Sequence, residues 1–339
     1  MHNLQKCVDT LLESKTVENI IVRVGRGDEI LVDLKRTAED RILTDETLFD
    51  MASVTKIVAT TSLALIAIDK GMLSPSDKVE KFFPVPEDRR ELTVFHLLTH
   101  TMGYGHKSLL KSERAYGEIE KYILSIPLDI PMGSNTRYSC PGFILLGRIL
   151  ESVYGMRLDE AFKKYVAEPL GMRDTGFLPD RTRDIVNANA KEELCGVVND
   201  YNCRYLGGVA GNAGVFSNLK DMTVFAKMLL SRGAPLFSEE TFISAAQNYT
   251  AEMEASRALG FLYVDGRYRQ TGGLFPSGSI GHCGHTGQSV FVDSGSGLYV
   301  IVLSDATLSV ARKLGKSSYD PVMQMRHDLH AAIKADLGL

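Results

Sequence analysis

The chain has 339 residues, of which 44% are hydrophobic and 24% are charged, and its formal net charge is −4. This length allows one large domain or two closely packed ones, and the balance of charges gives no sign of a nucleic-acid partner or a basic membrane-binding surface. Five scattered cysteines without a C-x-x-C pair are typical of reduced thiols. The N-terminus lacks the pattern of a signal peptide, and the most apolar stretch, residues 57–68, is shorter than the ~20 residues of a membrane span. We therefore expect a cytoplasmic protein without a membrane span.

The predicted elements begin with an amphipathic helix that places Leu4, Val8 and Leu11 on one side. Two β-rich runs follow at residues 20–24 and 29–34, and the glycine-rich GRGD between them predicts a hairpin. The chain therefore opens with a helix and two antiparallel strands.

The middle of the chain is dominated by helix patterns and long loops, up to about residue 235. Residues 48–70 read as one apolar helix, and the segment YSCPGFILLGRILESVYG predicts a second helix that closes on Gly155. A third helix is indicated by Asn218 with Asp221 three residues later, which resembles a capping box.

Strand patterns return near the C-terminus, where GQSVFVDSGSGLYVIVLSD predicts a second hairpin. The last segment predicts a helix with Asp320 as N-cap, Pro321 in the first position, and Met325, Leu329 and Ile333 on one side. Because strands occur at both ends of the chain, we infer one antiparallel sheet built from both ends, with a helical region inserted between them.

The apolar helix begins with a serine and a lysine that can touch. Ser53 and Lys56 are three residues apart and share a helix face. A serine hydroxyl needs a base to become a nucleophile, and the apolar residues after Lys56 predict a desolvated amine with a lowered pKa. The S-x-x-K matches at Ser108 and Ser217 are typical of a capping serine followed by a surface lysine, and the apolar context separates Ser53 from them.

Two further segments supply candidate site residues. Tyr138 stands at a loop-to-helix junction, and a phenol near an ammonium is expected to have a lowered pKa and to transfer protons. In GHCGHTGQS, glycines allow close approach of a substrate, and His285 is expected to face the site. The alternatives are a tyrosine packed at a helix entrance, an incidental histidine, or a metal site of His282, Cys283 and His285 without a second pair of ligands.

The order Ser-x-x-Lys, Tyr-Ser-x and His-Thr-Gly resembles the class C-like serine β-lactamases and penicillin-binding proteins. Further blocks in the family's order, including LFDMASVTKIVATT, LTVFHLLTHTMGY, EPLGMRDTGF and GHTGQS, extend the resemblance over about residues 45–290. It implies an α/β (α+β) fold in which a central antiparallel sheet is flanked by helices and carries an inserted all-helical subdomain. We expect residues 1–60 and 240–339 to form the sheet-and-helix domain, residues 61–239 to form the mostly helical subdomain, and the active site to lie between them.

The resemblance also implies roles for individual residues. Ser53 is expected to be the acylated nucleophile, with Lys56 and Tyr138 moving its proton. The backbone N–H groups of Ser53 and Gln288 are expected to form the oxyanion hole. No cofactor and no metal are implied. The expected substrate-binding residues are Cys140, His285, Thr286, Gly287 and Gln288.

Two departures from the family pattern bear on the substrate. Cys140 stands where many relatives have an asparagine whose amide binds the substrate, and His285 stands where β-lactamases usually have a lysine. We therefore predict a serine hydrolase that forms an acyl-enzyme with a small ester or amide and that binds β-lactams as a side activity. The alternatives are a D,D-carboxypeptidase or β-lactamase proper, and a catalytically silent relative that binds a ligand.

Overall fold

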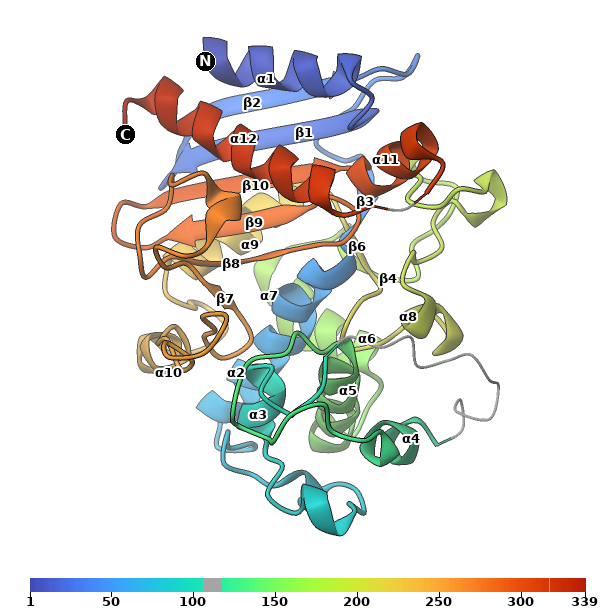
Figure 1. Cartoon of the computed structure of the whole chain (residues 1–339), viewed down its shortest axis with the longest axis vertical. Coiled ribbons are helices and arrows are strands. Elements are labelled where there is room, and N and C mark those ends of the chain that lie inside the picture. The colour runs from blue at the N-terminus through green and yellow to red at the C-terminus, as the bar shows by residue number, and fades with distance from the viewer. Residues whose placement is uncertain (106–117, 317) are drawn as a thin grey trace.

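The main sheet of the protein has six antiparallel strands in the order β2-β1-β10-β9-β8-β7 (Figure 1). The computed structural model describes residues 1–105, 118–316 and 318–339. The N-terminal hairpin lies beside the C-terminal one through the pairing of β1 with β10, which confirms a sheet built from both chain ends. The strands are β1 Asn19–Arg26, β2 Glu29–Thr37, β7 Leu262–Tyr263, β8 Ile280–Cys283, β9 Ser289–Asp293 and β10 Leu298–Ser304.

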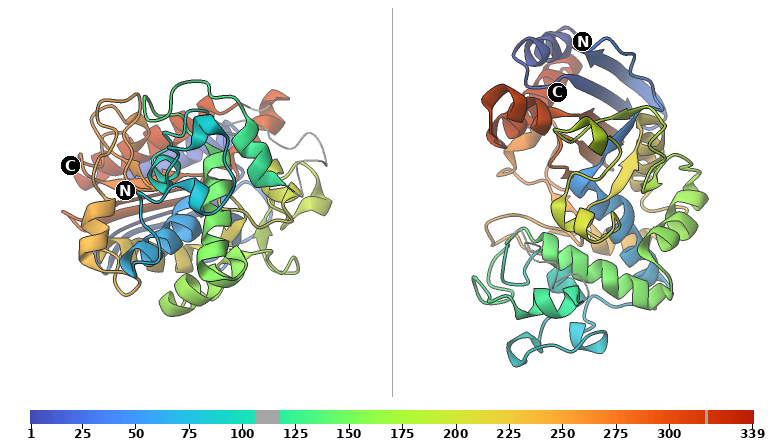
Figure 2. Two further views of the ribbon diagram at one scale, coloured as in Figure 1. Left: turned by 90° about the horizontal axis from the view of Figure 1, so that it is seen from below. Right: turned by 90° about the vertical axis from the view of Figure 1, so that its right-hand side faces the viewer.

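Helices cover both faces of this sheet (Figure 2). The helices α1 (His2–Glu13) and α12 (Asp320–Leu337) lie against each other on one face, and α9 (Leu219–Leu230) packs against β9 and β10 on the other. Successive strand residues point to opposite faces. On β1, accordingly, Val22 contacts the core under α1 and α12, and Ile21 contacts the larger core on the other side.

A second, smaller sheet of four short strands has the order β4-β6-β3-β5. The strand β3 pairs in parallel with β5 and antiparallel with β6. The predicted helix over residues 48–70 is therefore wrong at its start, where residues 48–50 form β3. The inserted region also contains β4, β5 and β6, so it is mostly helical rather than all-helical, and its boundaries at residues 61 and 239 stay a prediction. The strands are β3 Leu48–Asp50, β4 Gly176–Phe177, β5 Ile185–Val186 and β6 Val215–Ser217.

A central helical segment follows β3 and changes its geometry twice. A 3-10 turn over Ala52–Val54 leads into a π-helical turn over Lys56–Thr61 and then into α2 (Ser62–Asp69). By length and composition the stretch Ala52–Asp69 could span a membrane, but 83% of it is buried inside the fold. That degree of burial is typical of a core helix.

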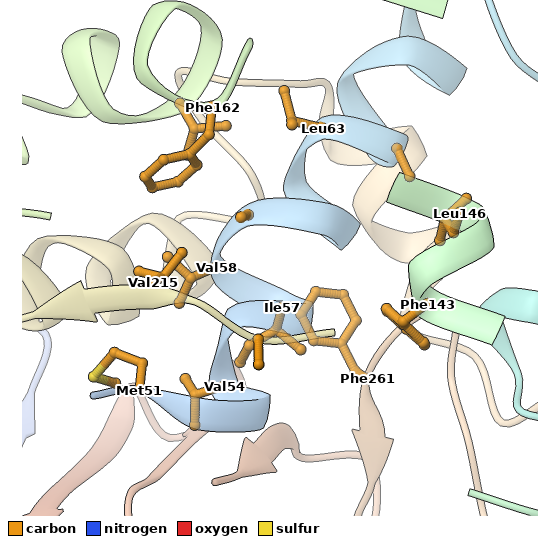
Figure 3. Close-up of a cluster of buried hydrophobic side chains, with 14 of the residues drawn as sticks. Met51, Val54, Ile57, Val58, Leu63, Phe143, Leu146, Phe162, Val215 and Phe261 are labelled. Atoms are coloured by element: carbon orange, nitrogen blue, oxygen red, sulfur yellow. The ribbon is translucent and has the colours of Figure 1, made fainter. Parts of the chain in front are cut away.

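Apolar side chains hold this segment in the larger core. Val54, Ile57 and Val58 are fully buried and lie between Val215 of β6 and Phe143 of α5 (Cys140–Tyr154) (Figure 3). A fully buried side chain of this size stabilises the fold by about 1.5–3 kcal/mol relative to an exposed one. The start of the segment, which carries Ser53 and Lys56, is therefore anchored on two sides.

Among the remaining helices, α5 and α10 (Glu239–Ala245) pack against this segment. The helix α5 starts after Ser139, whose Oγ accepts a hydrogen bond from the Gly142 N–H at 3.2 Å, and it ends at Gly155 with φ +64°, as predicted. The helix α12 begins one residue earlier than predicted, with Tyr319 rather than Asp320 as its N-cap. The other helices are α3 Val94–Leu98, α4 Ile119–Ser125, α5 Cys140–Tyr154, α6 Leu158–Phe162, α7 Glu168–Leu170, α8 Tyr201–Tyr205, α10 Glu239–Ala245 and α11 Ala306–Leu314.

Candidate active site

Ser53, Lys56 and Tyr138 converge at the start of the central helical segment. Ser53 lies in the 3-10 turn, and its Oγ is 3.0 Å from Lys56 Nζ at the first position of the π-helical turn. Tyr138 lies two residues ahead of α5 and donates from its hydroxyl to the same Oγ at 2.7 Å. The structure therefore brings the three predicted catalytic side chains into mutual contact.

The other S-x-x-K matches differ in their surroundings. Ser217 is buried in β6 with its Oγ 2.7 Å from Thr175 Oγ1, and Lys220 is exposed, so this pair builds no site. The match at Ser108 and Lys111 lies outside the described residues.

Lys56 is fully buried, and this burial controls its protonation. Its Nζ lies 2.9 Å from the Asn212 carbonyl oxygen and 3.5 Å from Cys140 Sγ. Burial, the largest cause, lowers the pKa of Lys56 from its ordinary 10.5, and the neighbouring Cys140 and Asp200 oppose this effect. A lowered pKa favours the neutral amine, which can accept a proton.

Tyr138 behaves differently from the expectation that a nearby ammonium lowers its pKa. Burial raises the pKa of Tyr138 well above its ordinary 10, and this outweighs the opposing effects of the Ser53 hydrogen bond and of Arg257. The rings of His100 and His282 lie 4.7 and 6.1 Å from the Tyr138 ring. Burial also holds the pKa of both histidines well below 6.5, so they are neutral. The resting phenol is therefore a proton donor.

A cavity of about 540 Å³ opens beside Ser53 and reaches Cys140. This volume is typical of a small-molecule site. The wall combines aromatic rings with hydrogen-bonding groups, so it can hold a substrate with both apolar and polar parts. The rings include those of Tyr201, Tyr268 and Tyr319, and the amides are Asn199, Asn202 and Gln270.

The end of β8 forms the wall opposite the helical segment. His282, Cys283 and His285 line the cavity, so the wall begins three residues earlier than the predicted His-Thr-Gly. Gly284 makes this close approach possible, because a Cβ there would lie 2.7 Å from the Met51 carbonyl oxygen. In the described chain the ligand atoms of the two histidines and the cysteine do not gather within 4.8 Å, so these residues form no three-ligand cluster.

Thr286, Gly287 and Gln288 are not in the cavity wall. The Thr286 hydroxyl donates to the Asp50 carbonyl oxygen at 3.0 Å, and the Gln288 amide donates to the Ser304 carbonyl oxygen at 2.9 Å. A Cβ on Gly287 would lie 2.2 Å from Ser304 Oγ. The chain turns away from the cavity here, and these three residues hold the turn against β3 and β10. Their contact with a substrate stays a prediction.

Asp50 is a site residue that sequence reasoning missed. It is fully buried at the end of β3, where Oδ1 accepts from the Ala52 N–H at 2.8 Å and Oδ2 accepts from the Asn199 N–H at 2.6 Å. It thereby ties the nucleophile turn to the loop that lines the cavity. Burial, the largest cause, raises the pKa of Asp50 to about 6. Its place three residues before the serine, in FDMAS, is the signal for it, and the prediction of a helix over this stretch hides that signal.

Two arginines from the C-terminal part of the chain were also missed. Arg257 lines the cavity beside Tyr138. Arg326 of α12 donates to the carbonyl oxygens of Gly284 and Gln288, and so fixes the turn after β8. Local patterns carry no signal for either residue, because each reaches the site only through the tertiary fold.

This arrangement defines a class of enzyme: a serine hydrolase with the β-lactamase and transpeptidase-like fold. A family model described as Beta-lactamase matches residues 4–316. The chain belongs to the β-lactamase family, and its predicted fold and enzyme class are confirmed.

Curated relatives place the chain near peptidase-named members of the family. A protein of Escherichia coli K12 described as "Putative D-alanyl-D-alanine carboxypeptidase" is 29% identical over 306 residues, with 77% of this chain and 70% of the relative covered. A protein of Salmonella typhimurium with the same description is 28% identical over 305 residues, with the same coverage of both chains.

Solved structures confirm the fold. The hydrolase EstCE1, described as having promiscuous acyltransferase activity, is similar with a TM-score of 0.75 at 19% identity, covering 97% of this chain and 98% of that one. A penicillin-binding protein homologue from Pyrococcus abyssi gives a TM-score of 0.69 at 21% identity, with 94% and 78% covered. Simvastatin synthase from Aspergillus terreus gives a TM-score of 0.73 at 18% identity, with 98% and 97% covered.

Proposed function

We propose that this enzyme transfers the acyl group of a small ester or amide first to Ser53 and then to water. One observation carries the proposal: two proton-transfer groups contact the Ser53 oxygen, with Lys56 Nζ at 3.0 Å and the Tyr138 hydroxyl at 2.7 Å. The neutral amine accepts the serine proton while Oγ attacks the substrate carbonyl carbon.

The negative charge of the tetrahedral intermediate needs preorganised N–H donors. The Ser53 N–H is one candidate. His285 supplies the second candidate N–H in place of Gln288, because it lines the cavity directly after Gly284, which packs against Met51. The sequence-based expectation places this N–H at Gln288. We place it instead at His285, which is in the same turn but faces the cavity.

Tyr138 completes the proton path. It gives its proton to the leaving group as the carbonyl–leaving-group bond breaks, and it regains a proton from the Lys56 ammonium. Water then attacks the acyl-enzyme, and its proton passes back through the same two groups until Ser53 is restored and the acid leaves. Atoms and charge balance over the two half-reactions.

The wall of the cavity favours esters over β-lactams. Cys140 Sγ lies 3.5 Å from Lys56 Nζ, and a thiol cannot supply the paired amide hydrogen bonds of an asparagine. His282 is a neutral group in the wall. The names of the curated relatives make D,D-carboxypeptidase the second candidate function.

A comparison of three probes tests the proposal. The protein is incubated with a short-chain nitrophenyl ester, a chromogenic cephalosporin and a fluorescent penicillin, alongside Ser53→Ala and the exposed-serine control Ser231→Ala. We expect ester turnover that falls by several orders of magnitude in Ser53→Ala only. Stable penicillin labelling without ester turnover would instead support the peptidase function. No adduct and no turnover with any probe would leave a ligand-binding relative.

A further inference from the structure

Arg257 carries a buried positive charge beside Tyr138. It is 9% exposed and lines the cavity, and its guanidinium carbon lies 5.7 Å from the centre of the Tyr138 ring. Its Nε and Nη1 atoms are buried without a hydrogen-bond partner, and the side chain makes no hydrogen bond or ion pair with any residue that the structure describes. The guanidinium therefore does not hold the fold together through bonds of its own.

Among the described residues, no carboxylate forms an ion pair with this guanidinium or is one of the groups that act most strongly on it. The groups that favour the protonated form of Arg257 are two phenols and a thiol, those of Tyr138, Tyr268 and Cys283. Burial lowers the pKa of Arg257 from 12.5, yet a guanidinium stays charged in proteins. A buried charge without a counter-charge is unfavourable for folding, so the significance of Arg257 lies in the groups on which its charge acts.

Besides Lys56, Arg257 is the described group that brings a positive charge close to Tyr138. Lys56 Nζ lies 4.9 Å from the Tyr138 ring centre. Both neighbouring histidines are neutral, because burial keeps their pKa values well below 6.5. The Arg257 charge opposes the ammonium form of Lys56 and favours proton loss from Tyr138. The other groups that face this pair are Cys140 of α5, Asp200 ahead of α8, His100 after α3, His282 of β8 and Tyr319 ahead of α12.

We infer that Arg257 is a positioning residue whose charge keeps the Lys56–Tyr138 pair short of one proton at neutral pH, so that Lys56 can accept the proton of Ser53. The inference rests on the acyl transfer proposed above. A positive charge beside the pair repels a further proton, and its effect is read from the pH at which the pair as a whole titrates.

The distance sets the size of the expected effect. With the 5.7 Å between the Arg257 guanidinium carbon and the Tyr138 ring centre taken as the separation, a unit charge acting on the pair in an effective dielectric of about 20 moves its titration midpoint by about two pH units. In Arg257→Gln we expect the midpoint of the acidic limb of kcat/KM to rise by about one to two pH units. In Arg257→Lys, which keeps the charge, we expect it to stay within about half a unit of the wild-type value. The exposed-arginine control Arg269→Gln is expected to leave the limb unchanged.

The experiment combines a kinetic and a spectroscopic measurement on the full chain. The pH profile of kcat/KM is recorded with an uncharged nitrophenyl ester. In protein labelled with 15N-lysine, the chemical shift of Lys56 Nζ, assigned with Lys56→Met, is followed over the same pH range. A second neutral variant, Arg257→Met, guards against a folding defect of the glutamine variant. Both variants are expected to melt no lower than the wild type, because no hydrogen bond or ion pair with the described chain is lost.

Each outcome decides the question. A Lys56 midpoint that rises in both neutral variants and not in Arg257→Lys supports the inference. A Lys56 midpoint that stays in place in both neutral variants overturns the inference. If the KM for a carboxylate-bearing ester rises in those variants while the midpoint stays in place, Arg257 binds the substrate instead. If the wild type hydrolyses no ester, the proposed acyl transfer fails, while the Lys56 titration still decides the role of Arg257.

Discussion

Replacing Asp50 with asparagine separates the stability of the fold from the order of the active site. The carboxylate accepts two N–H groups, those of Ala52 and Asn199, at 2.8 and 2.6 Å. In Asp50→Asn one of these contacts is lost, because the amide has a single acceptor oxygen. Movement of the nucleophile turn by about 1 Å is expected to lower kcat/KM by about 100-fold.

The stability of Asp50→Asn is expected to rise with pH relative to that of the wild type, whereas its activity is expected to be lower than that of the wild type. Burial raises the pKa of Asp50 from 3.8 to about 6, so the folded protein holds this proton more tightly than the unfolded chain does. Ionisation between pH 3.8 and about 6 therefore costs the wild type stability, by about 3 kcal/mol at about 1.4 kcal/mol per pH unit. The variant has no carboxyl proton to lose in this pH range. Its free energy of unfolding should therefore rise by this amount relative to that of the wild type.

Urea unfolding followed by circular dichroism at pH 4 and pH 7.5 measures this difference, and ester hydrolysis at pH 7.5 measures the activity. The exposed-residue variant Asp40→Asn is the control and should follow the wild type in both assays. A stability difference between Asp50→Asn and the wild type that does not change with pH would refute the assigned titration. Wild-type activity in Asp50→Asn would refute the positioning role of the carboxylate.

Two further substitutions test the geometry of the site. Tyr138→Phe removes the proton donor at 2.7 Å from Ser53 Oγ, so kcat/KM with a nitrophenyl ester should fall by about 10²–10⁴-fold, and an unchanged rate would remove the phenol from the mechanism. Gly284→Ala places a Cβ 2.7 Å from the Met51 carbonyl oxygen and should lower both the melting temperature and the activity. Gly266→Ala is its control, because nothing lies within 4 Å of that Cβ, and equal effects of the two alanines would contradict the packing argument.

Long periodic elements and local spacings could be predicted from the sequence. The hairpin β1–β2, the end of α5 at Gly155 and the apolar face of α12 follow from short-range patterns that the structure confirms. The contact between Ser53 and Lys56 follows from their spacing, since even the tighter 3-10 turn and the wider π-helical turn keep residues three apart close together.

Features that depend on the fold as a whole could not be predicted. The strands of the second sheet have two or three residues, too few for an alternating pattern to appear. GHCGHTG contains two consecutive His-x-Gly triplets, and only the register of β8 shows that His282 rather than Thr286 reaches the cavity. The raised pKa of Tyr138 depends on its burial, which the sequence does not reveal.

The pairing of β1 with β10 has a consequence for how this protein folds during its synthesis. Strand β1 can pair with β10 only after all the strands that lie between them in the sequence have been synthesised. Until then β1 presents an open edge and two apolar faces to the cell, a state prone to aggregation. We therefore expect chaperones to bind the growing chain until β10 has been made. Chains truncated before β10 should accumulate as insoluble material rather than as weakly active enzyme.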